Sequence, residues 1–211
     1  MFNWYNIDMY WYLKGNCMKD KLLDYMKEFT QLDDAALKKI ADDVPIATFL
    51  KGTVLLEQGD IPSKCYFVLD GLVRKYGITE EGNEITYDFY TKNQAVAIFG
   101  AQLTEKPSNY TLVCAEDSVL VVGDLDDAED VYQEHDGLEN MIRNMMESMM
   151  GELQEHHAVF ISSSPEERYR YILENRPTLI NRVPQHQLAS YLGIKPESLS
   201  RIKRRILKVV D

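Results

Sequence analysis

The stretch VPQHQLASYLGIKPESLSRIKRRI, residues 183–206, decides the fold of this chain. Its spacing predicts two short helices, 184–192 and 196 to about 208. A proline, whose fixed φ suits a first helical turn, opens each of them, and a glycine separates them. Ordinary αα-hairpins share part of this pattern, but here all seven positions that a helix-turn-helix requires hold suitable residues. They are Leu188, Ala189, Leu192, Gly193, Ile194, Leu199 and Ile202.

Charge divides the chain into two unlike parts. The whole sequence of 211 residues carries a formal net charge of −11. Residues 165–211 hold ten Lys or Arg against five Asp or Glu, a net +5, so the remainder carries −16. Such asymmetry indicates that the C-terminal part meets nucleic acid, while the acidic part repels phosphate and disfavours wrong orientations on DNA.

The cysteines and the N-terminus point to a cytoplasmic protein. Cys17, Cys65 and Cys114 are odd in number and far apart, so they form no disulfide framework or metal-spaced cluster, and we expect reduced thiols. Residues 1–17 are aromatic but contain Asn and Asp and lack a basic start, which argues against an export signal or a membrane span. They are an extension, a partner-binding segment or an artefact of the start codon.

The middle of the chain reads as short strands. Helices are expected near 19–29 and 33–43, and from Ile46 to Val122 apolar runs alternate with turns. This texture predicts an all-β sandwich or jelly roll, with a hairpin tip at EEGNE, residues 80–84. The expected corners are Gly52, Gly59, Gly71 and Gly82.

A long helix, about 137–161, follows the strands. Its apolar stripe has helical spacing and needs a partner, either the same helix of a second subunit or the β-domain of its own chain, and both can be partly true. The stripe consists of Leu138, Ile142, Met145, Met149, Leu153, His156 and Phe160. Ser164 is then expected to cap a further helix that begins at Pro165.

The order of these parts resembles the CRP/FNR (catabolite activator and fumarate-nitrate regulator) family of bacterial transcription factors. The resemblance rests on FLKGTVLLEQGDIPSKCYFVLDGLVRKYGITEEGNEITYDFY, residues 49–90, and on the helix-turn-helix. It implies an α+β fold with a cyclic-nucleotide-binding-like β-roll, a long dimerisation helix and a C-terminal helix-turn-helix whose terminal wing is reduced or absent. It also implies a non-enzymatic homodimer that binds double-stranded DNA and RNA polymerase.

We therefore divide the chain into four parts. They are an extension at 1–17, a sensor roll with N-terminal helices at 18–136, a dimerisation helix at 137–163 and a DNA-binding domain at 164–211. Two related recognition helices would enter successive major grooves about 34–36 Å apart, so small rotations at the dimer seam can favour or forbid binding.

The second helix of the helix-turn-helix supplies the expected DNA contacts. Arg201 can donate two hydrogen bonds to guanine, and Glu197 can accept one from cytosine. Ser198 and Ser200 lie beside them, and Glu-Ser-Leu-Ser-Arg resembles the fumarate-nitrate branch. The expected phosphate contacts are Lys195, Lys203, Arg204, Arg205 and Lys208, although any single lysine can be a solvated surface charge.

The sensor does not keep the family's cyclic-nucleotide residues. Where the resemblance places a glutamate, an arginine and a serine, this chain has Phe99, Asn109 and Tyr110. A buried phosphate without a paired cation is costly, so we expect no cyclic AMP response unless Lys106 or Arg74 reaches in. The three residues can frame a pocket for a less charged, unknown effector, or they can belong to an ordinary filled core.

Other chemistries lack their residues. Iron–sulfur clusters need grouped cysteines, and haem or cupin-type metal sites need histidines in the roll, whereas all four histidines follow it. We expect no cofactor and no catalysis. His156 and His157 could meet a metal across a dimer seam, but adjacent histidines are usually solvated. The remaining alternative function is a ligand- or protein-binding adaptor without sequence-specific DNA binding.

Overall fold

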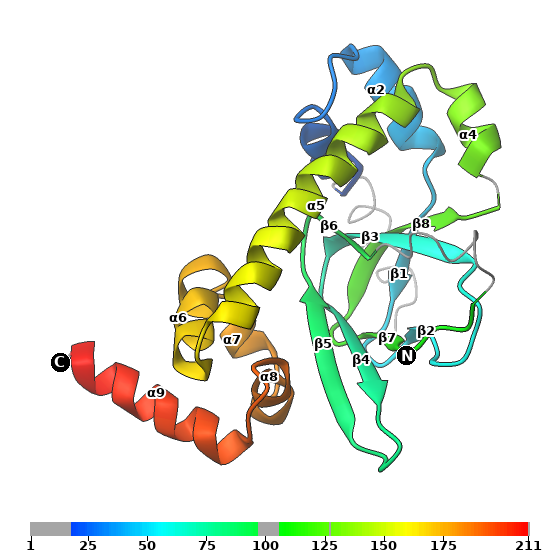
Figure 1. The fold of residues 1–211 in the computed structure, drawn as a ribbon. Helices are drawn as coiled ribbons and strands as arrows, with labels where there is room; N and C mark the ends of the chain where they lie inside the picture. The colour runs from blue at the N-terminus through cyan, green and yellow to red at the C-terminus, as the bar shows by residue number, and fades with distance from the viewer. Residues whose placement is uncertain (1–17, 97–105, 127, 211) are drawn as a thin grey trace, which may run out of the picture.

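The computed structural model describes residues 18–96, 106–126 and 128–210 of the chain (Figure 1). Residues 18–26 form a helix, and α2 (Asp34–Asp43) follows after a turn. The first helix is shorter than its expected range of 19–29 because Lys27 and Glu28 turn out of it. Asp33 caps α2 by accepting a hydrogen bond from the Ala36 N–H at 2.8 Å.

Among the described residues, eight short strands form two antiparallel four-stranded sheets. The order is β1-β8-β3-β6 in one sheet and β2-β7-β4-β5 in the other, the arrangement of a jelly roll. The strands are β1 (Ile46–Phe49), β2 (Val54–Leu56), β3 (Lys64–Asp70), β4 (Val73–Ile78), β5 (Glu84–Tyr90), β6 (Gln94–Val96), β7 (Thr111–Cys114) and β8 (Ser118–Asp124).

Strand β3 shows how the sequence builds the layers. Side chains alternate between the faces of a strand, so Tyr66 and Val68 enter the interior of the roll. Phe67 and Leu69 point the other way, into an apolar cluster with the N-terminal helices and the start of the long helix. The roll therefore has one core of its own and a second core under a helical cover.

The predicted glycine corners are confirmed. Gly52, Gly59, Gly71 and Gly82 all have positive φ, between 80° and 102°. Gly82 lies in the expected hairpin tip, where the Thr79 N–H donates to the Asn83 carbonyl at 2.9 Å and joins β4 to β5.

The C-terminal half is helical. Helices α4 (Ala128–Glu134) and α5 (Leu138–Ser162) follow the roll, and α5 runs from the α2 region to the last four helices (Figure 1). These are α6 (Pro165–Asn175), α7 (Leu179–Arg182), α8 (Gln185–Tyr191) and α9 (Pro196–Val210). The two sheets followed by these helices confirm the expected α+β architecture. We call β1–β8 the roll and α6–α9 the head.

Local signals at the helix ends are mostly confirmed. Ser164 caps α6 in a reciprocal capping box with Glu167, and Pro165 opens the helix. Pro196 opens α9 as expected. Pro184 does not open α8: its ψ of 144° is extended, so it precedes the helix as the N-cap and its carbonyl accepts from Gln187 and Leu188.

None of the helices among the described residues combines the length and apolarity that a bilayer crossing needs.

Candidate DNA-binding surface and sensor interior

The helix-turn-helix is held by the apolar residues that predicted it. Leu188, Leu192 and Leu199 are fully buried with Ile172 of α6 in one cluster. Gly193 ends α8 with a φ of 72°, a conformation that favours glycine. The Arg168 side chain from α6 then donates to the Leu192 carbonyl at 3.1 Å, which satisfies the end of α8.

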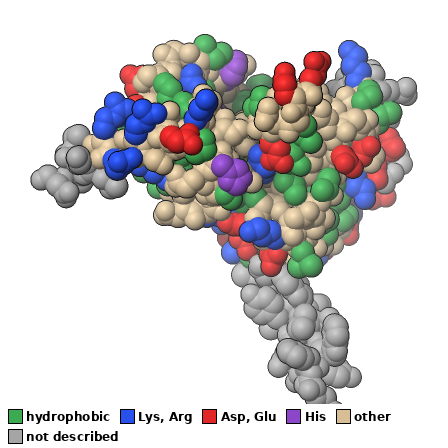
Figure 2. All heavy atoms as spheres, turned by 90° about the horizontal axis from the view of Figure 1, so that it is seen from below, with side chains coloured by type: hydrophobic (Ala, Val, Ile, Leu, Met, Phe, Trp, Pro, Cys, Tyr) green, Lys and Arg blue, Asp and Glu red, His purple; other side chains and the backbone are tan. Residues whose placement is uncertain are grey.

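Seven of the predicted base-reading and phosphate residues lie just before α9 or along its outer side, and the side chain of Lys208 lies outside the described residues. Six of them are exposed and Ser198 is half-buried; the exposed residues are Lys195, Glu197, Ser200, Arg201, Arg204 and Arg205. Figure 2 shows Lys and Arg side chains gathered at the α9 end of the molecule and most acidic side chains over the roll. The head therefore presents a cationic surface to one side.

Neighbouring groups orient the arginines of this surface. Arg201 Nε donates to the Glu197 carbonyl at 3.4 Å, and Arg205 forms an ion pair with Glu166 of α6 at 3.1 Å. Arg201 and Arg205 also line the groove between α9 and the start of α6. Lys203, which we expected to contact phosphate, instead lies with its Nζ over the Tyr169 ring. Partial burial lowers the pKa of Lys203.

Two of the three proposed effector residues lie in the described part of the chain. Asn109 is exposed, Tyr110 is half-buried against the roll core, and Phe99 lies outside the described residues. Arg74 is 4% exposed and donates to Glu84 at 2.7 Å and to Thr86, so it is already occupied. The effector pocket therefore stays a prediction.

Lys75 is a cation beside the roll core that the sequence reading missed. Its Nζ lies 3.8 Å from the centre of the Tyr110 ring, and burial lowers its pKa. Val73, two residues earlier on the same strand, is fully buried in the roll core. Alternation along β4 was thus the signal that could have indicated the direction of Lys75.

The apolar stripe of α5 packs against two different parts of the chain, the helical cover of the roll and the head. Leu138, Ile142 and Met145 pack into the helical cover of their own chain, and Phe160 packs against the head. His156 also faces the head, whereas Leu153 is 53% exposed. Leu138, at 4% exposure, has little surface left for a partner. Exposed apolar side chains extend from Leu153 to Met150 and Ile161, on the adjacent face of the helix.

His156 joins the long helix to the head. Its Nε2 lies 3.0 Å from the Tyr191 hydroxyl, and its ring lies between Phe160 and Tyr171. Burial is the main cause that lowers the pKa of His156 below 6.5; Arg176 and His157 lower it further, and Asp88 opposes them. The neutral ring is therefore the form that this contact stabilises.

We expect the protein to lose stability as the pH falls below about 6.5, the ordinary pKa of histidine. The folded-state pKa is depressed, so protonation favours the state in which His156 is exposed. Urea unfolding between pH 5 and 8 measures the effect. His156→Gln should flatten this part of the profile. The control His186→Gln alters an exposed residue of α8, and an equal flattening by it would contradict the assignment.

Within the described residues, no group of three His, Cys, Asp or Glu side chains could hold a metal ion.

Comparison with known proteins supports the architecture. Residues 46–135 match the family described as the cyclic nucleotide-binding domain. FixK2 from Bradyrhizobium japonicum superposes with a TM-score of 0.63 at 13% identity, over 78% of this chain and 85% of that chain. The chain thus has a region similar to cyclic nucleotide-binding domains and the fold of the CRP/FNR regulators.

Two further solved structures share this CRP/FNR fold. The c-di-GMP responsive global regulator CLP of Xanthomonas campestris has a TM-score of 0.61 and 13% identity, over 83% of this chain and 92% of its own. The catabolite activator protein of Thermus thermophilus has a TM-score of 0.51 and 19% identity, over 85% and 86%. No curated protein matches the chain in sequence.

Proposed function

We propose that this protein is a cytoplasmic, non-enzymatic transcription regulator of the CRP/FNR type that binds an inverted-repeat DNA site as a homodimer. The observation that carries the proposal is the outer side of α9, where Glu197, Ser200 and Arg201 are exposed on a helix whose inner side is fully packed. A helix presented in this way fits the major groove. The four-part division of the chain and the interaction with RNA polymerase belong to the same proposal.

The proposed dimer places α5 against α5 of a second subunit. Met150, Leu153 and Ile161 are more than half exposed although they are large and apolar. A parallel partner helix would cover them, as in a coiled coil. This seam keeps Leu153 of the predicted stripe and moves the centre of the contact towards Met150, because the opposite side of the stripe packs within the chain.

The effector is proposed to be something other than cyclic AMP. The exposed Asn109 and the engaged Arg74 provide no cation for a cyclic phosphate, and Lys75 lies against an aromatic ring. A bound phosphate would have to draw Lys75 away from Tyr110, bring the exposed Lys106 into the roll, or remain unpaired, which is costly in a buried site.

Selection of bound sites from random duplex DNA, at stated salt, tests the function directly. Against the selected site, Arg201→Ala should weaken binding by about 1–3 kcal/mol, roughly 5- to 150-fold, and should relax preference at one base pair of each half-site. The reason is that a bidentate contact to guanine is lost. Titration of the site and its single-base variants measures both effects.

Arg170→Ala is the matched control, because Arg170 is exposed on α6 and paired with Glu166. It should leave the base preference unchanged. Equal binding of all sequences by the wild-type protein would instead favour the adaptor function.

A further inference from the structure

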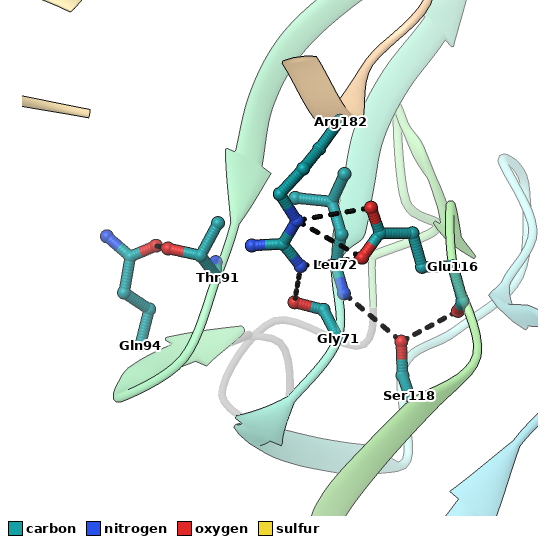
Figure 3. Close-up of polar contacts among 7 residues, drawn as sticks. All are labelled: Gly71, Leu72, Thr91, Gln94, Glu116, Ser118 and Arg182. Carbon is teal, nitrogen blue, oxygen red and sulfur yellow. Dashed lines mark hydrogen bonds and ion pairs between the residues drawn. The ribbon is translucent and has the colours of Figure 1, made fainter. Parts of the chain in front are cut away.

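Two arginines of the head are bound to the roll instead of facing DNA. Arg182, the last residue of α7, donates from Nη2 to the Gly71 carbonyl and to Glu116 Oε2, both at 2.6 Å, and from Nε to Glu116 Oε1 at 3.1 Å (Figure 3). The Ser118 hydroxyl donates to the Glu116 carbonyl at 2.9 Å and so braces the turn. Arg182 is therefore engaged by a preformed acceptor site on the roll.

Arg176 makes the second attachment, at the end of α6. Its guanidinium donates to the Phe89 carbonyl of β5, and its Nη1 lies 3.3 Å from Asp88 Oδ1 and 3.2 Å from the Tyr191 hydroxyl. The side chains of Arg176 and Asp88 are 16% and 21% exposed. Limited exposure makes this ion pair more sensitive to geometry than a surface pair.

Backbone and apolar contacts complete the attachment. The Thr86 N–H of β5 donates to the Ser190 hydroxyl of α8 at 2.9 Å. Leu72 and Phe89 of the roll are fully buried in the same cluster as the head residue Leu179. The head is thus fixed in one orientation against β5, and rotation of the head would break the polar contacts together.

This orientation places the acidic tip of the β4–β5 hairpin at the same end of the molecule as the start of α9 (Figure 1). Strand β5 packs on α8, and the β4–β5 hairpin extends alongside the head and past α8 (Figure 1). Its tip carries the exposed residues Glu80 and Glu81, whereas Glu84 at the start of β5 is paired with Arg74. Phosphates that approach α9 within a screening length of about 8–10 Å of this tip are repelled.

We propose that Arg176 and Arg182, with their acceptors on the roll, form a latch that holds the head in a resting orientation of low DNA affinity. This inference rests on the proposed function. DNA binding draws on the minority of molecules in which the head is released. A latch that is closed in about nine of ten molecules lowers the apparent affinity about tenfold.

The test is the double variant Asp88→Asn with Glu116→Gln, which keeps side-chain shape and removes both negative charges of the latch. It should bind the selected site about tenfold more tightly than the wild-type protein. Amide hydrogen exchange at Thr86 should accelerate, because the N–H loses its Ser190 acceptor when the head is released. The control Asp60→Asn with Glu134→Gln removes the same charge at exposed positions outside the latch and should change neither quantity.

Ser190→Ala removes the acceptor of the Thr86 N–H in every molecule, so it should accelerate exchange at Thr86 directly, whereas it should tighten DNA binding by a smaller factor than the double variant does. Unchanged or weaker DNA binding by a folded, dimeric double variant would overturn the latch and leave the proposed function intact. Retained protection at Thr86 in the double variant would overturn it regardless of DNA. Failure of wild-type and variant proteins alike to bind any DNA would overturn the latch together with the proposed function.

Discussion

Met150→Glu combined with Leu153→Glu is expected to give a monomer that no longer binds its operator. Both side chains are about half exposed in the single chain, 52% and 53%, and would be covered in the proposed seam. In a two-fold assembly each glutamate lies near its own copy, so four carboxylates would be buried without partners. A loss of at least about 4 kcal/mol of association free energy corresponds to roughly a thousandfold weaker dimer.

Sedimentation velocity over a range of concentrations measures the association, and titration of the selected site measures its consequence. The control Ser148→Glu with Ala158→Glu adds the same charges to exposed positions of α5 away from the stripe and should preserve the dimer. A double variant at Met150 and Leu153 that remains dimeric would place the seam on another surface.

The structure shows why the sequence could define the long helix but only part of its contacts. Apolar residues cover nearly half of the circumference of α5, and a helical period does not show which part is used within the chain. Met145 and Phe160 turn out to pack within the chain, whereas Met150 and Ile161, which the sequence reading left out, are exposed. Only the position of the roll and head resolves this choice.

Charge counting had a similar limit. Arg176 and Arg182 contributed to the net charge of +5 that indicated nucleic acid, yet both are paired with carboxylates of the roll. Sequence gives the number of charges but not their long-range partners, because residues 116 and 182 meet only in the folded chain. The cationic surface that remains lies mainly on α9.

The roll and the helix-turn-helix were more predictable because their signals are local. Glycine at a corner, alternation along a strand and a capping serine each act within a few residues, and the structure retains all three. Lys75 is the exception among the strands. Lysine side chains are usually exposed, and a lysine beside a buried core contradicts that preference for the surface. The alternation along β4 indicated an inward direction for Lys75, but the preference for the surface outweighed it.

Gly71→Ala is expected to be among the most destabilising single changes in the roll. Gly71 has a φ of 102°, and a Cβ added there would lie 2.6 Å from the Ser118 Cα, so backbone as well as side chain would have to move. Strained backbone and overpacking each cost about 1–3 kcal/mol, which gives a loss of roughly 2–6 kcal/mol in the free energy of unfolding. Urea unfolding followed by circular dichroism measures it.

Gly82→Ala provides the matched control, because Gly82 has a φ of 80° but nothing lies within 4 Å of an added Cβ. It should lose only about 1–2 kcal/mol, the cost of the left-handed conformation. The Gly71 carbonyl also accepts from Arg182, so Gly71→Ala should release the head and raise exchange at Thr86 under native conditions. Equal losses in the two variants would show that the contact with Ser118 relaxes freely, and the roll would then be more deformable than its packing indicates.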